Sequence, residues 1–339
     1  MEKRNTSGNI PSKDINISSG LLALNENDFG IPQCGSKFQA MILLSLIISL
    51  VGMVINGIVL RILGFQIQRN AFSIYILNLA VADFLYLCFQ FFFCLLNIIC
   101  DTDNTNMNSI SYQMDLFLYV LPKFPYFSGL SILSVISIER CLSVMWPIWY
   151  RCQRPRHTSA VTCVFLWALS LLLCLLEGKA CGLLFSSLNE RWCKTFRFIT
   201  GTWSIVLIVV LCGFNLTLLV KIFCGSKRIP VTRLYVTIAF TVLFFLIFCL
   251  PFVIYWFVLQ LVENMSILFN GFFYDALFLS CVNSCANPII YFLVGSIRHR
   301  RFQWKSLKLL LQRAMQDTPE EEDDGERSPS GNSEDVETV

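Results

Sequence analysis

The stretch Asn287-Pro288-Ile289-Ile290-Tyr291 lies in the second half of the last of seven long apolar runs, and these runs decide the fold. A helix needs about 20 apolar residues to cross a bilayer core of roughly 30 Å. Two of the runs, 70–100 and 116–138, each contain one charged residue, Asp83 and Lys123. Five runs contain none: 38–60, 158–176, 198–220, 234–262 and 276–297. The pattern predicts an all-α fold, a bundle of seven transmembrane helices.

The overall composition also indicates a membrane protein. Of the 339 residues, 55% are hydrophobic and 14% are charged, and the mean hydropathy is +0.62. A soluble domain of this length could not bury so much apolar surface, whereas lipid removes the need to bury it. With the N-terminus outside, the cytosolic loops and tail hold 16 basic residues and the outward loops hold five. This bias predicts a multi-pass plasma-membrane protein with an extracellular N-terminus and a cytoplasmic C-terminus.

The chain divides into segments around one membrane domain. The expected segments are 1–37 (polar, extracellular), 38–297 (membrane domain), 298–316 (amphipathic juxtamembrane helix) and 317–339 (acidic cytoplasmic tail). The sequons at Asn5 and Asn16 predict glycosylation of the first segment. The third segment mixes basic and apolar residues, which predicts a short eighth helix on the inner leaflet. The tail has the composition of a disordered chain, and its serines are expected phosphorylation sites.

Four of the 15 cysteines fall in outward-facing positions, where disulfides form. They are Cys34, Cys100, Cys181 and Cys193. Cys181 and Cys193 bracket the short loop between the fourth and fifth spans, and a bridge between them would contribute on the order of 2–3 kcal/mol in a chain-entropy model. Such a bridge would also pin the outer end of the fifth span. A pairing of Cys34 with Cys100 stays open.

An ionisable residue in the middle of a span indicates polar partners or a function, because its insertion into the membrane costs roughly 2.5–3.5 kcal/mol. Asp83 is such a residue, in the second span. Four polar residues of the first and seventh spans are candidate partners: Asn56, Asn283, Ser284 and Asn287. Static hydrogen bonds between helices would explain this set. We favour a network that holds Na⁺ or a proton and rearranges, because Pro288 kinks the helix beside Asn287 and Pro251 provides a second hinge.

An acid and an arginine stand side by side at the cytosolic end of the third span, in Glu139-Arg140-Cys141. A lone arginine at a helix end is commonly an anchor that extends its guanidinium to the membrane interface. The adjacent acid predicts a latch instead, from which protonation or helix motion frees Arg140 for another partner.

Taken together, these residues resemble the rhodopsin-like G-protein-coupled receptor family over roughly residues 39–313. The likeness rests on the order and spacing of short motifs: Asn56, Leu-Ala-Val-Ala-Asp83, Glu139-Arg140-Cys141, Pro147, Trp167, Pro251 and Asn287-Pro-Ile-Ile-Tyr291. Further stretches are similar to the Mas-related receptors, most of all to the rodent B subgroup: Arg69 to Ser73, Trp146 to Cys152, Leu175 to Lys179 and Leu310 to Pro319. This resemblance implies an extracellular ligand, coupling to heterotrimeric Gq or Gi proteins, and a role in sensory neurons or mast cells.

The resemblance also implies which residues couple such a receptor to its partners. A ligand would favour an open bundle, in which a G-protein helix docks in a cytosolic cleft. The residues expected to carry coupling and activation are Glu139, Arg140, Pro147, Pro251, Asn287, Pro288 and Tyr291. Receptor kinases and an arrestin would then act on the tail. Apart from Na⁺ as an allosteric ion, no cofactor, metal centre or nucleic acid is expected, and the lipid bilayer is itself a partner.

Two other classes of protein fit the chain less well. A transporter or channel, the alternative function, would show internal repeats or several broken helices, and the sequence shows neither. An enzyme is not expected, because the only histidines, His157 and His299, lie at the cytosolic face and no HExxH or Gly-x-Ser-x-Gly motif occurs.

The outer ends of the helices, where a ligand would bind, differ from the family pattern. The top of the third span lacks the usual cysteine, so the bridge of the Mas-related receptors, Cys181 to Cys193, is the expected substitute. Relatives that bind cationic ligands use two acids; one matches Glu177, but Arg197 stands where the other would be. Glu177 therefore either contacts the ligand or pairs with Lys179 or Arg197, and we expect a weakened response to polycations.

Four aromatic residues near the outer ends of the helices are further candidates for the ligand site: Tyr126, Trp203, Tyr255 and Trp256. Aromatic belts at the membrane interface explain such residues equally well without a ligand. The expected ligand site consists of these four aromatics with Glu177 and Arg197.

Overall fold

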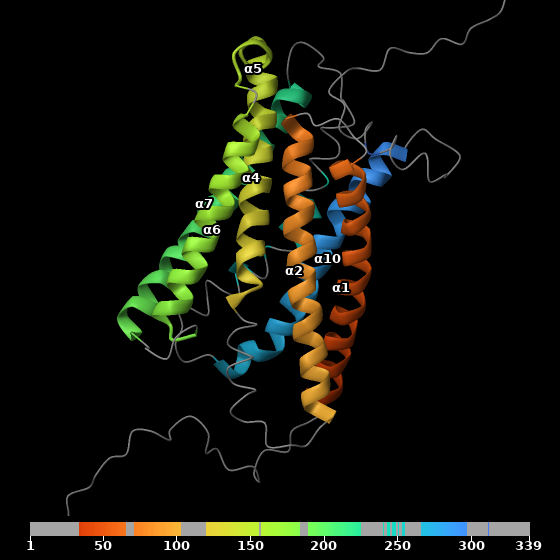
Figure 1. The fold of residues 1–339 in the computed structure, drawn as a ribbon, viewed down its shortest axis with the longest axis vertical. Coiled ribbons are helices and arrows are strands. Elements are labelled where there is room, and N and C mark those ends of the chain that lie inside the picture. The colour runs from red at the N-terminus through yellow and green to blue at the C-terminus, as the bar shows by residue number, and fades with distance from the viewer. Residues whose placement is uncertain are drawn as a thin grey trace, which may run out of the picture.

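The computed structural model describes most of the membrane domain. The described residues are 34–65, 71–102, 120–155, 157–183, 189–224 and 266–296, with short pieces between 240 and 254 and Leu311. Every regular element in this part of the chain is a helix. The helices, shown in Figure 1, are α1 (Cys34–Phe65), α2 (Ala71–Thr102), α4 (Lys123–Met145), α5 (Pro147–Cys152), α6 (Thr158–Ala180), α7 (Glu190–Cys224) and α10 (Ser266–Ser296).

Five of these helices, α1, α2, α4, α6 and α7, are long and apolar enough to cross a membrane. Each overlaps one of the apolar runs, and α10 overlaps the last run, including Asn287 and Pro288. The all-α prediction is therefore confirmed for the described residues. The run 234–262, which includes Pro251, lies mostly outside them.

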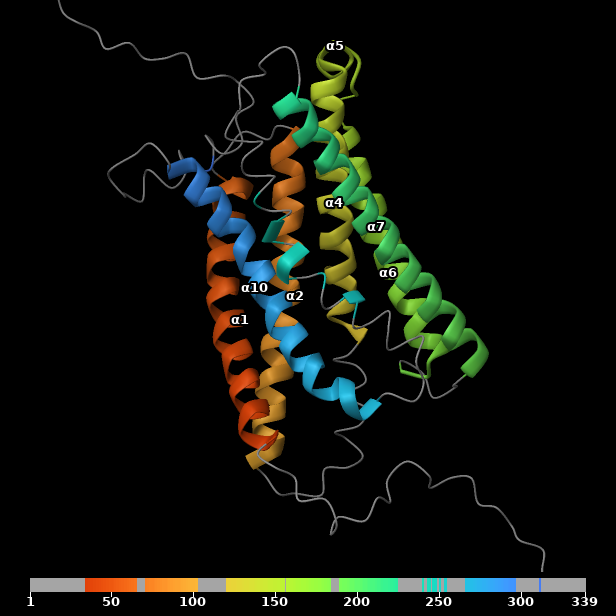
Figure 2. The ribbon, with the colours of Figure 1, turned by 180° about the vertical axis from the view of Figure 1, so that it is seen from behind.

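From α1 to α7 successive long helices run in opposite directions, whereas α10 runs in the same direction as α7, as Figures 1 and 2 show. The short helix α5 lies at one end of the bundle, which we call the α5 end. The loop from α6 to α7 lies at the other end, which we call the disulfide end after the Cys181–Cys193 bridge there. The described candidate functional residues lie at these two ends and in a polar region between them.

Helix α4 lies inside the bundle, in contact with α2, α6 and α7. In its apolar stretch 72% of the residues are buried, against 28–44% in the other four candidate spans. Those outer helices turn large apolar side chains outward, for example Ile47 on α1, Val164 on α6 and Val209 on α7. Such surfaces are stable only against hydrocarbon, so lipid completes the fold.

A ladder of four serines suits α4 to this central place. Its members are Ser128, Ser131, Ser134 and Ser137, all buried, and each hydroxyl donates to the carbonyl four residues earlier. The hydroxyls are thus satisfied within α4, while their small size lets other helices approach. Two of them also join α4 to α7: the Ser134 hydroxyl lies 3.1 Å from the Leu207 carbonyl oxygen, and the Asn215 amide donates to Ser137 at 2.6 Å.

Helix α1 packs closely against α2 and α10 at Gly52. A β-carbon added at this position would overlap the Cys285 sulfur on α10 and a methyl group of Leu87 on α2. Gly64, near the end of the same helix, has no described atom within 4 Å of the corresponding point. The two glycines therefore form a matched pair for testing the contact between the helices.

We expect Gly52→Ala to lower the free energy of unfolding by about 1–3 kcal/mol, the usual effect of overfilling a packed core. Gly64→Ala should be neutral or slightly stabilising, because alanine has the higher helix propensity and meets no neighbour there. Thermal unfolding of the purified protein in detergent measures both variants. Equal melting temperatures would contradict the close contact at Gly52.

Several sequence predictions concern residues outside the described part. They are the glycosylation sites Asn5 and Asn16, most of segment 1–37, the amphipathic helix 298–316 apart from Leu311, and the tail 317–339. The side chains of Cys34 and Cys100 are also outside the description. All of these stay predictions.

Candidate functional site

Polar contacts join three helices inside the membrane domain. The Asn287 side-chain amide on α10 donates to the Asp83 carboxylate on α2 at 2.7 Å, and both residues are buried. The Asn56 amide on α1 donates to the Ser284 carbonyl on α10 at 3.0 Å. These contacts lie next to Pro288, which removes one backbone hydrogen bond from α10.

The same region contains acceptors that no described residue satisfies. The side-chain oxygens of Asn56 and Asn283 are buried and have no hydrogen-bond donor among the described residues. The structure thus brings Asp83 together with Asn287, and Asn56 together with Ser284, whereas Asn283 contributes an unused acceptor. A bound cation or water is the kind of group that such acceptors accommodate.

At the α5 end, Arg154 bonds Glu139 to the loop after α5. The carboxylate oxygens of Glu139 accept from Arg154 Nε at 3.0 Å and Nη2 at 2.8 Å, and the Tyr75 hydroxyl on α2 donates to it at 3.0 Å. Arg154 also donates to Ser159 Oγ near the start of α6. The acid therefore ties together α2, α4, the loop after α5 and α6.

Arg140 is buried, and its guanidinium lies over the Phe72 ring, 3.7 Å from the ring centre. The latch predicted between Glu139 and Arg140 stays a prediction. Arg154 approaches from the loop and presents both nitrogens of its planar fork to the carboxylate.

Loop residues around Glu139 have shifted pKa values. Burial, reinforced by the Glu139 carboxylate, raises the pKa of Tyr150 to about 12. Burial acts to lower the pKa of Arg154, but the hydrogen bonds and charge of Glu139 outweigh it, so this pKa is raised. Both side chains therefore keep their protons at physiological pH and act as hydrogen-bond donors.

Next to this cluster, the start of the loop presents an apolar surface. Its exposed side chains are Met145, Trp146, Ile148 and Trp149, and Ile148 is 80% exposed. Pro147 occupies the first turn of α5, where its fixed φ angle suits the start of a helix. Exposed large apolar residues at a helix end are suited to contact with a partner or with the membrane interface.

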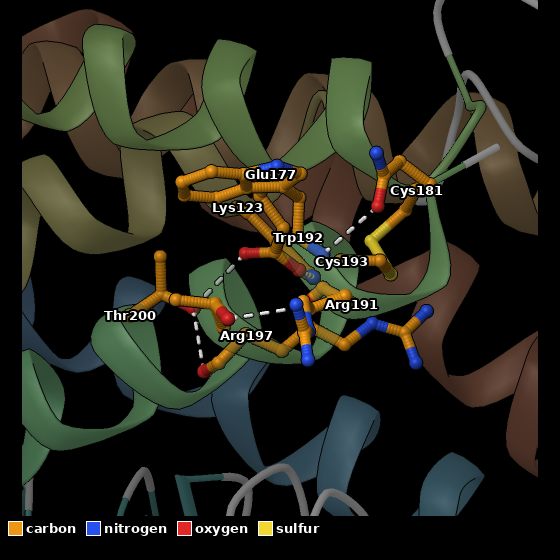
Figure 3. The surroundings of a disulfide bond; sticks show 10 residues. Lys123, Glu177, Cys181, Arg191, Trp192, Cys193, Arg197 and Thr200 are labelled. Atoms are coloured by element: carbon orange, nitrogen blue, oxygen red, sulfur yellow. Dashed lines mark hydrogen bonds and ion pairs between the residues drawn. A yellow bond between two sulfur atoms is a disulfide. The ribbon is translucent and has the colours of Figure 1, made fainter. Parts of the chain in front are cut away.

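At the opposite end, a disulfide joins Cys181, just after α6, to Cys193 on α7, as Figure 3 shows. The predicted bridge is therefore confirmed. The Asn189 backbone N–H also donates to the Ala180 carbonyl at 3.1 Å. These links hold the last turn of α6 against the first turns of α7.

Removing the bridge should loosen this end of the bundle. We expect the double variant Cys181→Ser/Cys193→Ser to lose about 2–3 kcal/mol of unfolding free energy, because the unfolded chain regains the freedom of the closed loop. Cys152→Ser is the control, since Cys152 is an exposed free cysteine at the α5 end. Unchanged thermal unfolding of the double variant would contradict a stabilising role for the bridge.

Glu177 lies in a buried ion pair with Lys123, the first residue of α4. Lys123 Nζ is 2.6 Å from one carboxylate oxygen, and the Thr200 hydroxyl on α7 donates to the other at 3.0 Å. The two charged side chains are only 10% and 3% exposed. Figure 3 shows this group beside the disulfide, where it links α4, α6 and α7. The partner of Glu177 is therefore neither Lys179 nor Arg197, the two cations expected from the sequence.

Lys123 is absent from the site predicted from the sequence, although the sequence contains a signal for it. It is the single charge in the run 116–138, and a lysine within a span requires an acid at a similar depth. Glu177, at the end of the fourth apolar run, is such an acid. The pairing is hard to see because 54 residues separate the two side chains.

Arg197 lies on α7, one turn after Cys193. Its Nε is buried and has no hydrogen-bond partner among the described residues. The Arg197 residue as a whole is half-buried, at the same end of the bundle as Lys123 and Glu177 (Figure 3).

Two of the four aromatic candidates are described. The ring of Tyr126 on α4 lies 5.8 Å from that of Tyr86 on α2, whose hydroxyl shares a hydrogen bond with Ser280 on α10. Trp203 on α7 is partly buried and packs against the core around α4. The other two candidates, Tyr255 and Trp256, lie outside the described residues. Tyr126 thus lies where α2, α4 and α10 meet.

Comparison with known proteins gives the class to which this architecture belongs. The family profile described as "7 transmembrane receptor (rhodopsin family)" matches residues 55–291. The chain therefore belongs to the rhodopsin family of seven-transmembrane receptors. The predicted fold class is confirmed by this membership, and the protein is a receptor and not an enzyme.

Its relatives within that family are Mas-related receptors. "Mas-related G-protein coupled receptor member B2" of Mus musculus is 65% identical over 307 residues, which cover 90% of this chain and 89% of the relative. Member X2 of Mus musculus is 57% identical over 344 residues, covering 100% and 96%, and member B4 is 55% identical over 307 residues, covering 90% and 92%. The chain thus belongs to the Mas-related G-protein-coupled receptors, and the predicted likeness to the rodent B subgroup is confirmed.

Proposed function

We propose that this receptor lies in the plasma membrane, with an extracellular N-terminus and a cytoplasmic C-terminus, and converts the binding of an extracellular peptide or small amphiphile into activation of Gq or Gi. Family membership supports the general function, an extracellular ligand coupled to a G protein. Two features support the orientation. Disulfides form on the oxidising side of a membrane, and the basic residues favour the opposite side.

The observation that carries the proposal is the course of α4. Its first residue, Lys123, belongs to the ion pair at the disulfide end, and its last two turns carry Glu139 and Arg140 at the α5 end. A helix of 23 residues is about 35 Å long. Because α4 is packed against three other helices, a shift at the Lys123 end alters the contacts of Arg140.

Activation is then a shift between two populations of the bundle. A ligand that prefers the open bundle changes the ratio of the two states tenfold for every 1.4 kcal/mol, approximately, of differential affinity. Opening exposes a cytosolic cleft bordered by Arg140, Pro147 and Tyr291, with hinges at Pro251 and Pro288. A helix of the G protein docks in this cleft, and the exposed apolar side chains of the α5 end add contact surface.

Na⁺ is the proposed allosteric ion of the polar region between the two ends. The residues present fit such an ion, because Asp83 offers a carboxylate and Asn56 and Asn283 offer buried amide oxygens that no described donor satisfies. Na⁺ would supply a counter-charge for Asp83. The Asn287 bond to Asp83 orients the carboxylate and links α2 to α10.

Asp83→Asn should abolish any dependence of basal signalling on Na⁺, because the amide lacks the charge that attracts the cation. The measurement is ligand-free nucleotide exchange at increasing NaCl, with potassium chloride holding the ionic strength constant. Ser49→Ala, a change at a buried serine that contacts Cys281, is the control and should retain the wild-type response. A sodium effect that persists in Asp83→Asn would contradict the site.

The remaining partners act on the tail. Receptor kinases would phosphorylate serines in residues 317–339, and an arrestin would then bind the phosphorylated chain. The likeness to Mas-related receptors supports signalling in sensory neurons or mast cells.

A calcium assay in cells that co-express a promiscuous G protein tests the proposal. Basic, neutral and acidic peptides are applied to wild type and to Arg140→Ala, with surface levels matched by staining an N-terminal tag in intact cells. At least one probe should raise calcium in wild type and fail in the variant. A response that survives Arg140→Ala would contradict coupling at the α5 end, and a tag stained only after permeabilisation would contradict the orientation.

A further inference from the structure

We propose that the aromatic ring of Phe72 holds Arg140 in the closed bundle, and that the strength of this contact sets the ligand-free activity of the receptor. Phe72 is thus a positioning residue that acts through Arg140. The inference rests on the proposed function, because it requires that Arg140 carries the coupling to the G protein.

The two side chains meet at the α5 end of the bundle. The central guanidinium carbon of Arg140 lies 3.7 Å from the centre of the Phe72 ring. Phe72 is the second residue of α2, and Arg140 lies in the last two turns of α4, so the contact joins the neighbouring ends of these helices. A cation above an aromatic ring is attracted by the negative charge on the π face of the ring.

Both side chains are buried, which strengthens the contact and keeps a partner away from Arg140. Phe72 is 7% exposed and Arg140 is 2% exposed. A cation–π contact is stronger where water is excluded than at an open surface. Because Arg140 offers almost no surface to a docking helix, it must leave the ring before the G protein can contact it. The contact with Phe72 therefore favours the closed arrangement over the open one.

The fifth and sixth spans, which border the cytosolic cleft, provide no carboxylate that could hold Arg140 instead. Residues 191–262 cover all of α7 except its first residue, the third cytosolic loop and the sixth apolar run, and they contain neither Asp nor Glu. The carboxylate of Glu139 already accepts hydrogen bonds from α2 and from the loop after α5. Phe72 covers the flat face of the guanidinium, whereas hydrogen bonds use its N–H edge, so the two kinds of contact are compatible. Weakening the ring alone should therefore shift the equilibrium towards the open bundle.

Fluorinated phenylalanines test the role of the π face. Fluorine withdraws electron density from the ring and changes its size little, so the attraction for the cation falls stepwise while the packing is kept. Mono-, di- and trifluorophenylalanine are incorporated in place of Phe72 by nonsense suppression, and phenylalanine incorporated by the same route is the reference. Ligand-free nucleotide exchange is measured with purified G protein on membranes at matched receptor levels. Exchange should rise with each fluorine, to roughly fivefold, and Phe72→Leu, which has no π face, should reach about tenfold.

Ile76→Val is the control for packing. Ile76 is buried one turn further along α2, and the loss of one methylene there should lower the melting temperature without raising ligand-free exchange. Exchange that stays constant along the fluorine series, or that rises as much in Ile76→Val as in the trifluorinated receptor, would overturn the proposal. The fluorinated rings keep the shape of Phe72, so the series decides the question even if Phe72→Leu does not fold.

Arg140→Ala separates this inference from the proposed function. It should abolish receptor-dependent exchange in the reference and in the trifluorinated receptor alike, because the ring acts only through Arg140. Exchange that survives Arg140→Ala would contradict the proposed function itself. A constant fluorine series together with a silent Arg140→Ala would overturn only the role of Phe72.

Discussion

Lys123→Met is expected to destabilise the receptor by about 3–5 kcal/mol, because it leaves an acid buried without its counter-ion. The Glu177 side chain is 3% exposed, so water cannot replace the lysine, and the Thr200 hydroxyl provides one neutral hydrogen bond in place of a full charge. The melting temperature of the purified receptor and the fraction that reaches the cell surface should both fall sharply.

Two further variants isolate the cause of this loss. Lys123→Met/Glu177→Met removes both charges together, and most of the lost stability should return, since a buried ion pair is often replaceable by apolar residues of similar volume. Lys194→Met removes a lysine whose pair with Glu190 is 58% and 78% exposed, and it should have little effect. If Lys123→Met is as stable as Lys194→Met, the buried pair does not hold the helices.

Arg154→Ala should raise ligand-free G-protein activation about tenfold or more. The substitution removes the two hydrogen bonds from Arg154 to Glu139 and the one to Ser159. The loop after α5 is then no longer bonded through this side chain to α4 and α6. A loss of only about 1.4 kcal/mol from the closed arrangement is enough for a tenfold change in the ratio of the two states. Nucleotide exchange on purified G protein without ligand measures this ratio.

Milder substitutions of the residues that bond to Glu139 should give intermediate effects on basal activity. Arg154→Lys keeps the charge but loses the planar fork, so its basal activity should lie between those of wild type and Arg154→Ala. Tyr75→Phe removes one hydrogen bond to Glu139 and should have a smaller effect in the same direction, of about 1 kcal/mol. Basal activity in Arg154→Ala at or below the wild-type level, in a variant that folds, would show that the cluster does not restrain signalling.

The helices were predictable from the sequence because lipid determines both their length and their internal hydrogen bonding. The described spans α1, α2, α4, α6 and α7 accordingly each overlap a predicted apolar run. The disulfide was predictable for a related reason. Cys181 and Cys193 are 12 residues apart at the facing ends of two neighbouring antiparallel helices, so they have few other partners within reach.

The charged contacts could not be predicted in the same way, because each joins residues from different elements. Lys123 and Glu177 are 54 residues apart, and Glu139 and Arg154 are 15 residues apart. Arg140 is the nearest cation to Glu139 in the chain, yet its guanidinium points to an aromatic ring. Which cation meets which acid depends on the rotation of each helix about its axis, and apolar periodicity does not determine that rotation closely enough.

The serine ladder of α4 bears on how this helix moves. A hydroxyl whose acceptor belongs to its own helix takes its hydrogen bond with it when the helix slides or turns. A displacement of roughly one or two ångström, the size of many helix shifts, would leave those bonds intact. Helix α4 can therefore slide along its axis without breaking them. Within the ladder, Ser134 and Ser137 also bond to α7, so these two would have to exchange partners when α4 slides. The contact between α4 and α7 is therefore the one that such a shift changes.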